Sequence, residues 1–391
     1  MKFDFDKVVD RHGTKCLKYD FAKERGRSDD MLPLWVADMD FQTAPGIQKS
    51  LSDAVAHGIY GYSEGKDDYF QAAAGWYEKH FGWKVEKEWL IKTPGVVFAL
   101  AMAVKAYTKE GDAVLLQQPV YYPFSEVITD NHRRLINSPL QQIDGHYEIN
   151  FEEFEQKIVE ENVKLFLMCS PHNPVGRVWK EWELRKIGDI CLKHNVLVVS
   201  DEIHSDFTYG ENIHHVFASL DEKYAAITTT CTAPSKTFNI AGLQISNIWI
   251  SNPELRARFR AEVTAAGYSQ VNLMGLVACQ AAYETGEEWL KELKIYLEGN
   301  LDYVRTFLKE NLPEIKLTEP EGTYLLWLDF KSLGMKEEQL KDLVENKAKL
   351  WLDSGAMFGP DGGGFERINI ACPREILKQA LTQLAESVHD R

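Results

Sequence analysis

The sequence predicts an α/β fold in which a large domain, with a mostly parallel sheet wrapped by helices, is followed by a smaller α/β C-terminal domain. Three observations predict it. From about residue 95, short β-branched runs alternate with segments of helical periodicity. The runs are apolar on both faces, as strands covered by helices are. The chain has 391 residues, 45% of them hydrophobic, which is too long for one small core.

The composition excludes several classes of function. The formal net charge is -15, and lysine and arginine never form a long cluster, which argues against nucleic acid and anionic membranes as partners. The N-terminus carries charge in every turn, unlike a secretory signal, so we expect a cytoplasmic protein. The six cysteines have no CxxC spacing, and we expect reduced thiols with no metal site.

The elements of the large domain follow in chain order. A stripe of apolar residues predicts a helix over residues 95–112, with Gly111 as its stop. A second helix is expected over 182–195. Buried strands are expected at 113–119, 163–171, 196–202, 225–235 and 247–251. We assign residues 46–285 to this large cofactor-binding domain.

A second set of elements begins with a long helical stretch over residues 286–313. The set continues with an apolar run at 323–330, a charged helix at 336–350, an apolar run at 367–373 and a final helix at 374–388. We therefore assign residues 286–391 to a small C-terminal domain. Residues 1–45 do not fit the alternation, and we expect this N-terminal segment to pack on the small domain.

Polar residues follow three of the predicted strands. Asn173 lies just beyond one strand, Asp201 ends the next, and Ser235 and Lys236 lie in a turn after the third. Ligands of a parallel sheet bind outside the carboxyl ends of its strands, so these side chains should converge on one crevice. A lysine among apolar neighbours has a lowered pKa and becomes an amine nucleophile. Such an amine with a remote acid predicts a Schiff-base enzyme that uses pyridoxal 5'-phosphate.

Three stretches carry a resemblance to a known family: SPHNPVGRVW at 170–179, SDEIH at 200–204 and SKTFNIAGL at 235–243. They resemble the signature stretches of pyridoxal-phosphate-dependent enzymes of fold type I, in the aminotransferase class I/II family. LPLWVADMDF at 32–41, together with SKTFNIAG, resembles the cystathionine β-lyase and carbon-sulfur β-lyase subgroup. The resemblance runs from about residue 31 to residue 375.

The resemblance implies three catalytic residues. Lys236 binds the cofactor covalently and then acts as the general base at the substrate Cα. Asp201 accepts the pyridinium N–H of the cofactor, which keeps that nitrogen charged. Tyr121 stacks on the cofactor ring, and Asn173 hydrogen-bonds the ring oxygen.

The resemblance also implies a phosphate site shared between two subunits. The phosphate lies at a helix N-terminus, where Gly95, Val96 and Val97 offer backbone N–H groups to an anion. The hydroxyl of Ser235 adds a further donor. Tyr62, in IYGYSEG, reaches the phosphate of the neighbouring subunit, which implies a homodimer with a shared active site.

Arg367 resembles the family arginine that binds the α-carboxylate of the substrate, and Asn173 and the backbone near Ala37 belong to the same substrate site. Two positions depart from the family pattern. Gln244 stands where many relatives carry a phosphate-binding arginine, so the helix dipole, hydroxyls or another cation must serve instead. His204 stands where many aminotransferases carry a tyrosine, and it either bonds the ring oxygen or leaves that role to Asn173.

The resemblance implies β-elimination on small amino acids: L-cystathionine, L-cysteine or cysteine S-conjugates give pyruvate, ammonia and a thiol. Transamination would use the same residues, so a class I/II aminotransferase is an alternative. A pyridoxal-phosphate-binding regulatory protein with little catalysis is the alternative from another class. The glycine-rich FGPDGGGFER at 358–367 does not match a P-loop, and His214 is expected to be a solvated loop residue.

Overall fold

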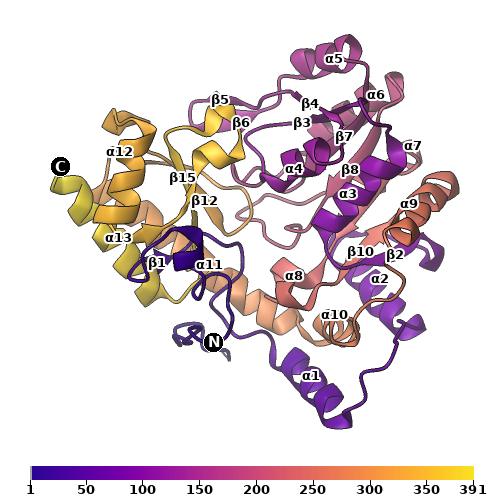
Figure 1. The fold of residues 1–391 in the computed structure, drawn as a ribbon, viewed down its shortest axis with the longest axis horizontal. Coiled ribbons are helices and arrows are strands. Elements are labelled where there is room, and N and C mark those ends of the chain that lie inside the picture. The colour runs from indigo at the N-terminus through magenta and orange to yellow at the C-terminus, as the bar shows by residue number, and fades with distance from the viewer. Residues whose placement is uncertain (1) are drawn as a thin grey trace.

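The computed structural model describes residues 2–391 and contains a seven-stranded sheet. This sheet lies between layers of helices (Figure 1). The strand order is β2-β10-β9-β8-β7-β3-β4. β10 runs antiparallel to both of its neighbours, and the other described pairs are parallel. The predicted fold class is therefore confirmed. The strands are β2 Leu90–Thr93, β3 Ala113–Leu116, β4 Arg134–Asn137, β7 Val163–Cys169, β8 Leu197–Asp201, β9 Thr228–Thr232 and β10 Ser246–Trp249.

Two apolar cores lie on the two faces of this sheet, because successive residues of a strand point to opposite faces. In β7, Leu165 and Leu167 belong to the core under α3 (Val96–Tyr107) and α9 (Pro253–Ala265). Phe166 and Met168 belong to the core on the other face, which α5 and α6 cover. The remaining helices of the large unit include α1 Pro45–His57, α2 Asp67–Phe81, α4 Pro123–Thr129, α5 Phe151–Glu160, α6 Glu181–Lys193, α8 Pro234–Thr237 and α10 Leu273–Thr285.

The end of α3 differs from the prediction. The helix stops at Tyr107, before Gly111, because Thr108 has an extended backbone and its hydroxyl donates a hydrogen bond to the carbonyl of Val104. A threonine that bonds back in this way competes with the helix. Gly111 has a φ of 81° and instead serves the turn into β3.

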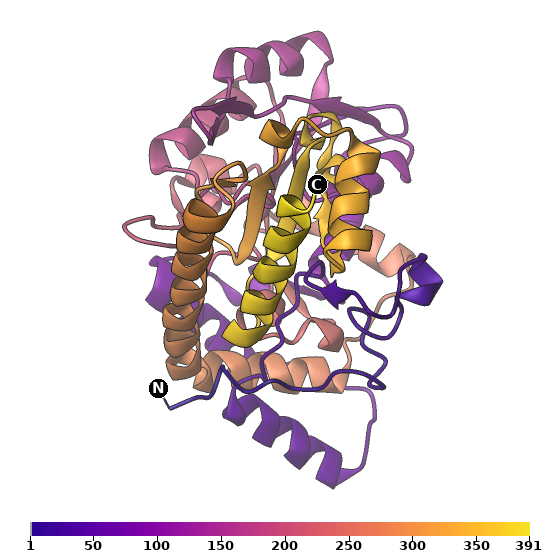
Figure 2. The ribbon, with the colours of Figure 1, turned by 90° about the vertical axis from the view of Figure 1, so that its left-hand side faces the viewer.

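The smaller unit is built on a four-stranded antiparallel sheet of order β11-β12-β15-β14. Figure 2 shows α11 and α13 side by side over this sheet. The predicted charged helix is present but changes form, since α12 ends at Lys341 and continues directly as a π-helix over Asp342–Lys347. The elements are α11 Glu287–Asn311, β11 Lys316–Thr318, β12 Leu325–Asp329, α12 Glu337–Lys341, β13 Leu350–Trp351, β14 Asp353–Ser354, β15 Phe365–Asn369 and α13 Arg374–His389.

The start of the chain lies against this smaller unit. β1 (Leu32–Pro33) pairs in parallel with β13, and the rings of Trp35 and Trp351 stack with centroids 4.5 Å apart. We keep the division into residues 1–45, 46–285 and 286–391 as a proposal, which these contacts support. No helix within residues 2–391 is long and apolar enough to cross a membrane.

Candidate active site

A cavity of about 340 Å³ opens where β7, β8 and β9 end. Asp201 is the last residue of β8, and Lys236 lies on α8, just after β9. The cavity lining includes every predicted site residue except Arg367 and Tyr62. These lining residues are Ala37, Gly95, Val96, Val97, Tyr121, Asn173, Asp201, His204, Ser235 and Lys236. The strand ends therefore bring together the side chains that the sequence places there.

The amine of Lys236 is fixed inside this cavity. Its Nζ donates a hydrogen bond to the carbonyl of Ala37 at 2.9 Å, and the hydroxyl of Tyr324 donates to the same carbonyl at 3.0 Å. Burial lowers the pKa of Lys236 to about 8, although the charge of Asp38 acts in the opposite direction. The lowered pKa leaves more of the lysine as free amine, the form that attacks an aldehyde.

Asp201 and His204 are both buried, and burial moves their pKa values in opposite directions. Burial raises the pKa of Asp201 to about 7, despite the N–H that Ile203 donates to its Oδ1 at 3.1 Å. Burial lowers the pKa of His204 to about 3, so its imidazole is neutral. The Nδ1 of His204 has no hydrogen-bond partner within the described residues. The cavity therefore contains two unsatisfied groups. A cationic N–H donor would stabilise the ionised form of the Asp201 carboxyl, and the Nδ1 of His204 can bond a ligand.

Arg367 lies on β15, is only 2% exposed, and approaches the cavity from the smaller unit. Its guanidinium donates to Asn173 Oδ1 at 3.1 Å, to the Trp35 carbonyl at 2.7 Å and to the carboxylate of Asp353. Its Nε is buried and has no partner in the part of the chain that is described. Three of the five N–H groups of the fork are thus used, and the Nε–H and one N–H of Nη1 remain for a ligand carboxylate.

The cavity is also lined by the N-terminus of α3, which no side chain of residues 2–391 caps. Its free N–H groups and the positive end of the helix dipole favour an anion. Among the described residues, Lys236 is the only lysine or arginine that lines the cavity. Gln244 lines it and also a neighbouring cavity of about 780 Å³. Tyr62 lines that second cavity and is 95% exposed, so it lies outside the site of its own chain.

Comparison with known proteins decides the family. The family model described as aminotransferase class I and II matches residues 30–384. The chain belongs to this family. The resemblance read from the sequence is therefore confirmed.

Three proteins are similar along nearly the whole chain. Cystathionine beta-lyase PatB of Bacillus subtilis (strain 168) is 43% identical over 381 residues, covering 97% of this chain and 98% of PatB. The solved structure of cystalysin from Treponema denticola, which contains pyridoxal 5'-phosphate, matches with a TM-score of 0.96 and 39% identity over the full length of both chains. The PLP-bound C-S lyase from Staphylococcus hominis matches with a TM-score of 0.93 and 33% identity, covering 99% and 98% of the two chains.

The residues that line the cavity fit pyridoxal phosphate. The buried atoms without a partner in residues 2–391 include the Nδ1 of His204 and the Nε of Arg367. Buried polar atoms are rarely left unpaired, so these atoms indicate a polar ligand. An amine, a carboxyl and an uncapped helix N-terminus match the aldehyde, the ring nitrogen and the phosphate of that cofactor.

Sequence reasoning missed two residues that hold the site. Asp353 pairs with Arg367 because β14 and β15 place the two residues opposite each other, and no motif marks it. Tyr324 bonds the carbonyl that also holds Lys236. The Asp353 contact depends on strand register, and the Tyr324 contact joins residues 287 positions apart, so no local pattern signals either of them.

The prediction for His214 is wrong, because this histidine is buried and its Nε2 lies 2.8 Å from Glu202 Oε2. Glu202 also accepts hydrogen bonds from the hydroxyl of Ser200 and the N–H of Phe217. A short polar stretch looks solvated in sequence, but here a buried carboxylate supplies its partner. Glu202 thus braces the loop that follows Asp201.

Proposed function

We propose that this protein is a pyridoxal-phosphate-dependent carbon-sulfur β-lyase. It cleaves the Cβ–S bond of L-cystathionine, L-cysteine or cysteine S-conjugates and, with one molecule of water consumed, yields pyruvate, ammonia and a thiol. One observation carries the proposal: Lys236, Asp201 and Asn173 line one cavity beside Arg367, in a chain that is 43% identical to PatB. The wording of that relative's name, cystathionine beta-lyase, supports the substrate class.

The chain's own residues would hold the cofactor at both ends. Lys236 binds it covalently through Nζ, Asp201 accepts the ring N–H, and Tyr121 covers the ring. The backbone at Gly95, Val96 and Val97 and the hydroxyl of Ser235 hold the phosphate. When bound, the cofactor supplies an electron sink for the charge that deprotonation leaves at Cα.

Arg367 and Lys236 orient the substrate and move its proton. Arg367 binds the α-carboxylate through the N–H groups that the protein leaves free, and Asn173 and Asp353 keep its guanidinium in place. The lowered pKa of Lys236 would make its free amine a general base for the Cα proton near neutral pH. Asp201 would stay ionised while it faces a charged ring nitrogen. This ion pair would keep the nitrogen charged, and the charged nitrogen would stabilise the negative charge that develops in the transition state.

The proposal includes a cytoplasmic homodimer. One exposed loop carries Ile59, Tyr60 and Tyr62. This loop lies beside the second cavity, and Gln244 lines both that cavity and the active-site cavity. A second copy that covers this loop would bring the Tyr62 hydroxyl to the phosphate end. All six cysteines are free thiols in the described chain, which supports a reducing compartment.

The deciding experiment incubates the loaded enzyme with L-cystathionine and no keto acid. A β-lyase accumulates pyruvate and thiol over many turnovers. An aminotransferase stops after one turnover, and that result would contradict the lyase assignment. A regulatory protein with little catalysis would give neither product.

Two lysine variants serve as controls in this assay. Lys236→Ala should lose activity by roughly 10²–10⁴-fold or more, because it removes the general base as well as the covalent anchor. Lys223→Ala removes a surface lysine that pairs with Asp189, and it should retain the activity of the unmodified enzyme.

A further inference from the structure

The segment of residues 35–41, here called the strap, contacts both the substrate arginine and the catalytic lysine. Its carbonyl groups accept hydrogen bonds from side chains of distant segments. The Trp35 carbonyl accepts from Arg367, and the Ala37 carbonyl accepts from Lys236. Asn369 donates to the carbonyls of Val36 and Asp38 at 2.7 and 2.6 Å. The position of the strap therefore fixes the position of both active-site cations.

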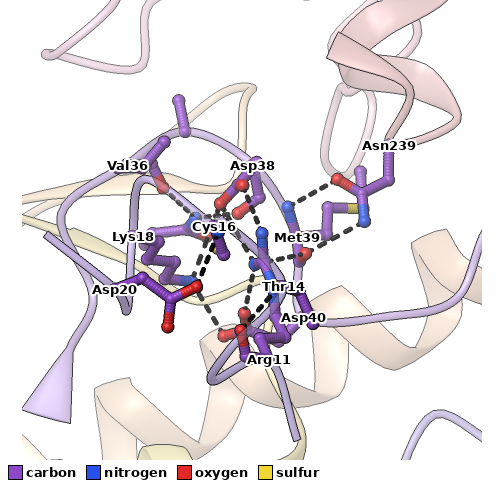
Figure 3. Close-up of polar contacts among 12 residues, drawn as sticks. Arg11, Thr14, Cys16, Lys18, Asp20, Val36, Asp38, Met39, Asp40 and Asn239 are labelled. Carbon is purple, nitrogen blue, oxygen red and sulfur yellow. Dashed lines mark hydrogen bonds and ion pairs between the residues drawn. The ribbon is translucent and has the colours of Figure 1, made fainter. Parts of the chain in front are cut away.

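The side chains of the strap are held from the other side by two cations of the N-terminal segment (Figure 3). Arg11 binds Asp38 and Asp40, each at 2.6 Å, and also donates to the Met39 carbonyl at 3.1 Å. Lys18 is fully buried, and its Nζ lies 2.8 Å from Asp40 and 4.0 Å from Asp38. Two cations thus hold two carboxylates that are only two residues apart.

The Asn239 side chain connects this cluster to the loop of the catalytic lysine. Its Nδ2 donates to the carbonyls of Met39 and Phe41 at 2.9 and 2.8 Å, and its Oδ1 accepts the N–H of Met39 at 2.9 Å. Asn239 is three residues beyond Lys236 in the same turn. Movement of the strap would therefore be transmitted to the lysine loop.

Among the charged groups near Lys236, the carboxylate of Asp38 has the largest effect on its pKa, and it raises that pKa. The charged groups that face Lys236 are Asp38 on the strap, Asp201 on β8 and Arg367 on β15, while His204 is neutral. Asp38 favours the ammonium form of the lysine. Arg11 contacts this same carboxylate and compensates its charge.

We propose that Arg11 is a positioning residue for the reaction, which fixes the strap against Lys236 and offsets the negative charge that Asp38 presents to the lysine amine. The proposal rests on the proposed function in one respect, namely that Lys236 is the reactive amine. An arginine suits this position because one planar fork reaches both carboxylates and the carbonyl between them, whereas an ammonium is a single point charge. Arg11, Asp38 and Lys236 also line one cavity of about 590 Å³, so a displaced strap would open the lysine to water.

The test measures the titration of Lys236 in cofactor-free protein, through the pH dependence of its acetylation by acetic anhydride, read by peptide mass. Arg11→Gln should raise the titration midpoint of Lys236 by about one pH unit, because an uncompensated carboxylate favours the ammonium. Asp38→Asn should lower the midpoint, and the double variant should return it toward that of the unmodified protein. Arg11→Lys keeps a charge but loses the fork, so it should lie between Arg11→Gln and the unmodified protein.

In the loaded enzyme, the pH midpoint of the visible absorption band should move in the same direction for each variant. Arg185→Gln is the matched control, because it breaks an exposed pair with Glu181 and should leave both midpoints unchanged. A folded Arg11→Gln protein with an unchanged or lowered midpoint would overturn the proposal. If that variant does not fold, an unchanged midpoint in Asp38→Asn would overturn it equally. The acetylation readout does not depend on lyase activity, so the two proposals can fail separately.

Discussion

At the scale of single residues, Asp201 and Lys236 are the groups that burial changes most usefully. Burial brings the pKa of Asp201 to about 7 and that of Lys236 to about 8. Each group can therefore change protonation near neutral pH when a charged ligand enters the cavity. Perturbed pKa values of this kind are common where catalysis takes place.

The raised pKa of Asp201 predicts how the cofactor-free protein responds to pH. Its folded-state pKa of about 7 exceeds its ordinary value of 3.8, so the native state binds the proton more tightly than the unfolded state. The resulting stabilisation is complete below about pH 4 and is lost as the pH rises through 7. The loss amounts to roughly 4 kcal/mol at most, from about three pKa units.

Urea unfolding of cofactor-free protein at several pH values between 4.5 and 8 checks this prediction. The free energy of unfolding of the unmodified protein should fall with pH relative to that of Asp201→Asn, whose amide does not titrate. Parallel pH curves for the two proteins would show that the pKa of Asp201 in the folded protein is not raised to about 7.

The sequence predicted the residues that follow a general rule and missed those that depend on register. Asn173, Asp201 and Lys236 come directly after apolar runs, and the carboxyl ends of parallel strands meet at one edge. Asp353 and Arg11 carry no such mark. Each contacts its partner only because β-strand register or a crossing segment brings distant residues together.

At the scale of elements, the turn over residues 170–179 is braced by a buried arginine. Arg177 donates to both oxygens of Glu183 at 2.9 and 3.0 Å, to Glu321 at 2.8 Å and to the carbonyl of Tyr147. Glu183 lies in the first turn of α6, and Glu321 lies just before β12. The turn that carries Asn173 is thus tied to both units of the molecule.

Arg177→Ala should destabilise the protein by about 3–5 kcal/mol, because it leaves two carboxylates without their cation in a buried site. Chemical denaturation of the two proteins measures the difference. Arg185→Ala is the control, since its pair with Glu181 is exposed and should contribute less than about 1 kcal/mol. Equal stability losses for the two variants would contradict the role given to Arg177.

The predicted elements match best where long apolar runs are fully buried, as in β7 and β8. β4 was missed because it is four residues long and partly exposed, so its pattern is weak. The antiparallel direction of β10 also has no signature in a short apolar run. Strand direction depends on the connection and on the neighbouring strands, which local periodicity does not encode.

At the scale of the whole molecule, the exposed Tyr62 predicts that two chains share each active site. Lys236→Ala and Tyr62→Ala are made separately, and each homodimer should have low activity. In a mixed dimer, the site on the Tyr62→Ala chain keeps its own Lys236 and receives an intact Tyr62 from its partner. Random mixing of equal amounts should therefore recover about a quarter of the activity of the unmodified enzyme, since half of the dimers carry one complete site.

Mixing after reversible dissociation, followed by the pyruvate assay, measures this recovery. A mixture no more active than the average of its two parents would contradict a shared site. A mixture of Lys236→Ala with Asp201→Asn is the control, because both changes lie in one chain's cavity and each mixed dimer keeps no complete site.

The strap also has a consequence for the order in which the enzyme is made. Residues 35–41 leave the ribosome well before Arg367 and Asn369, which bind three of their carbonyls across sequence separations of 331 to 333 residues. Domains of nascent chains generally fold from the N-terminal side first, so the large sheet can form while the strap still lacks these partners. The strap is therefore fully held only after β15 has been synthesised, and a chain that stops short of β15 would leave Lys236 without a fixed strap.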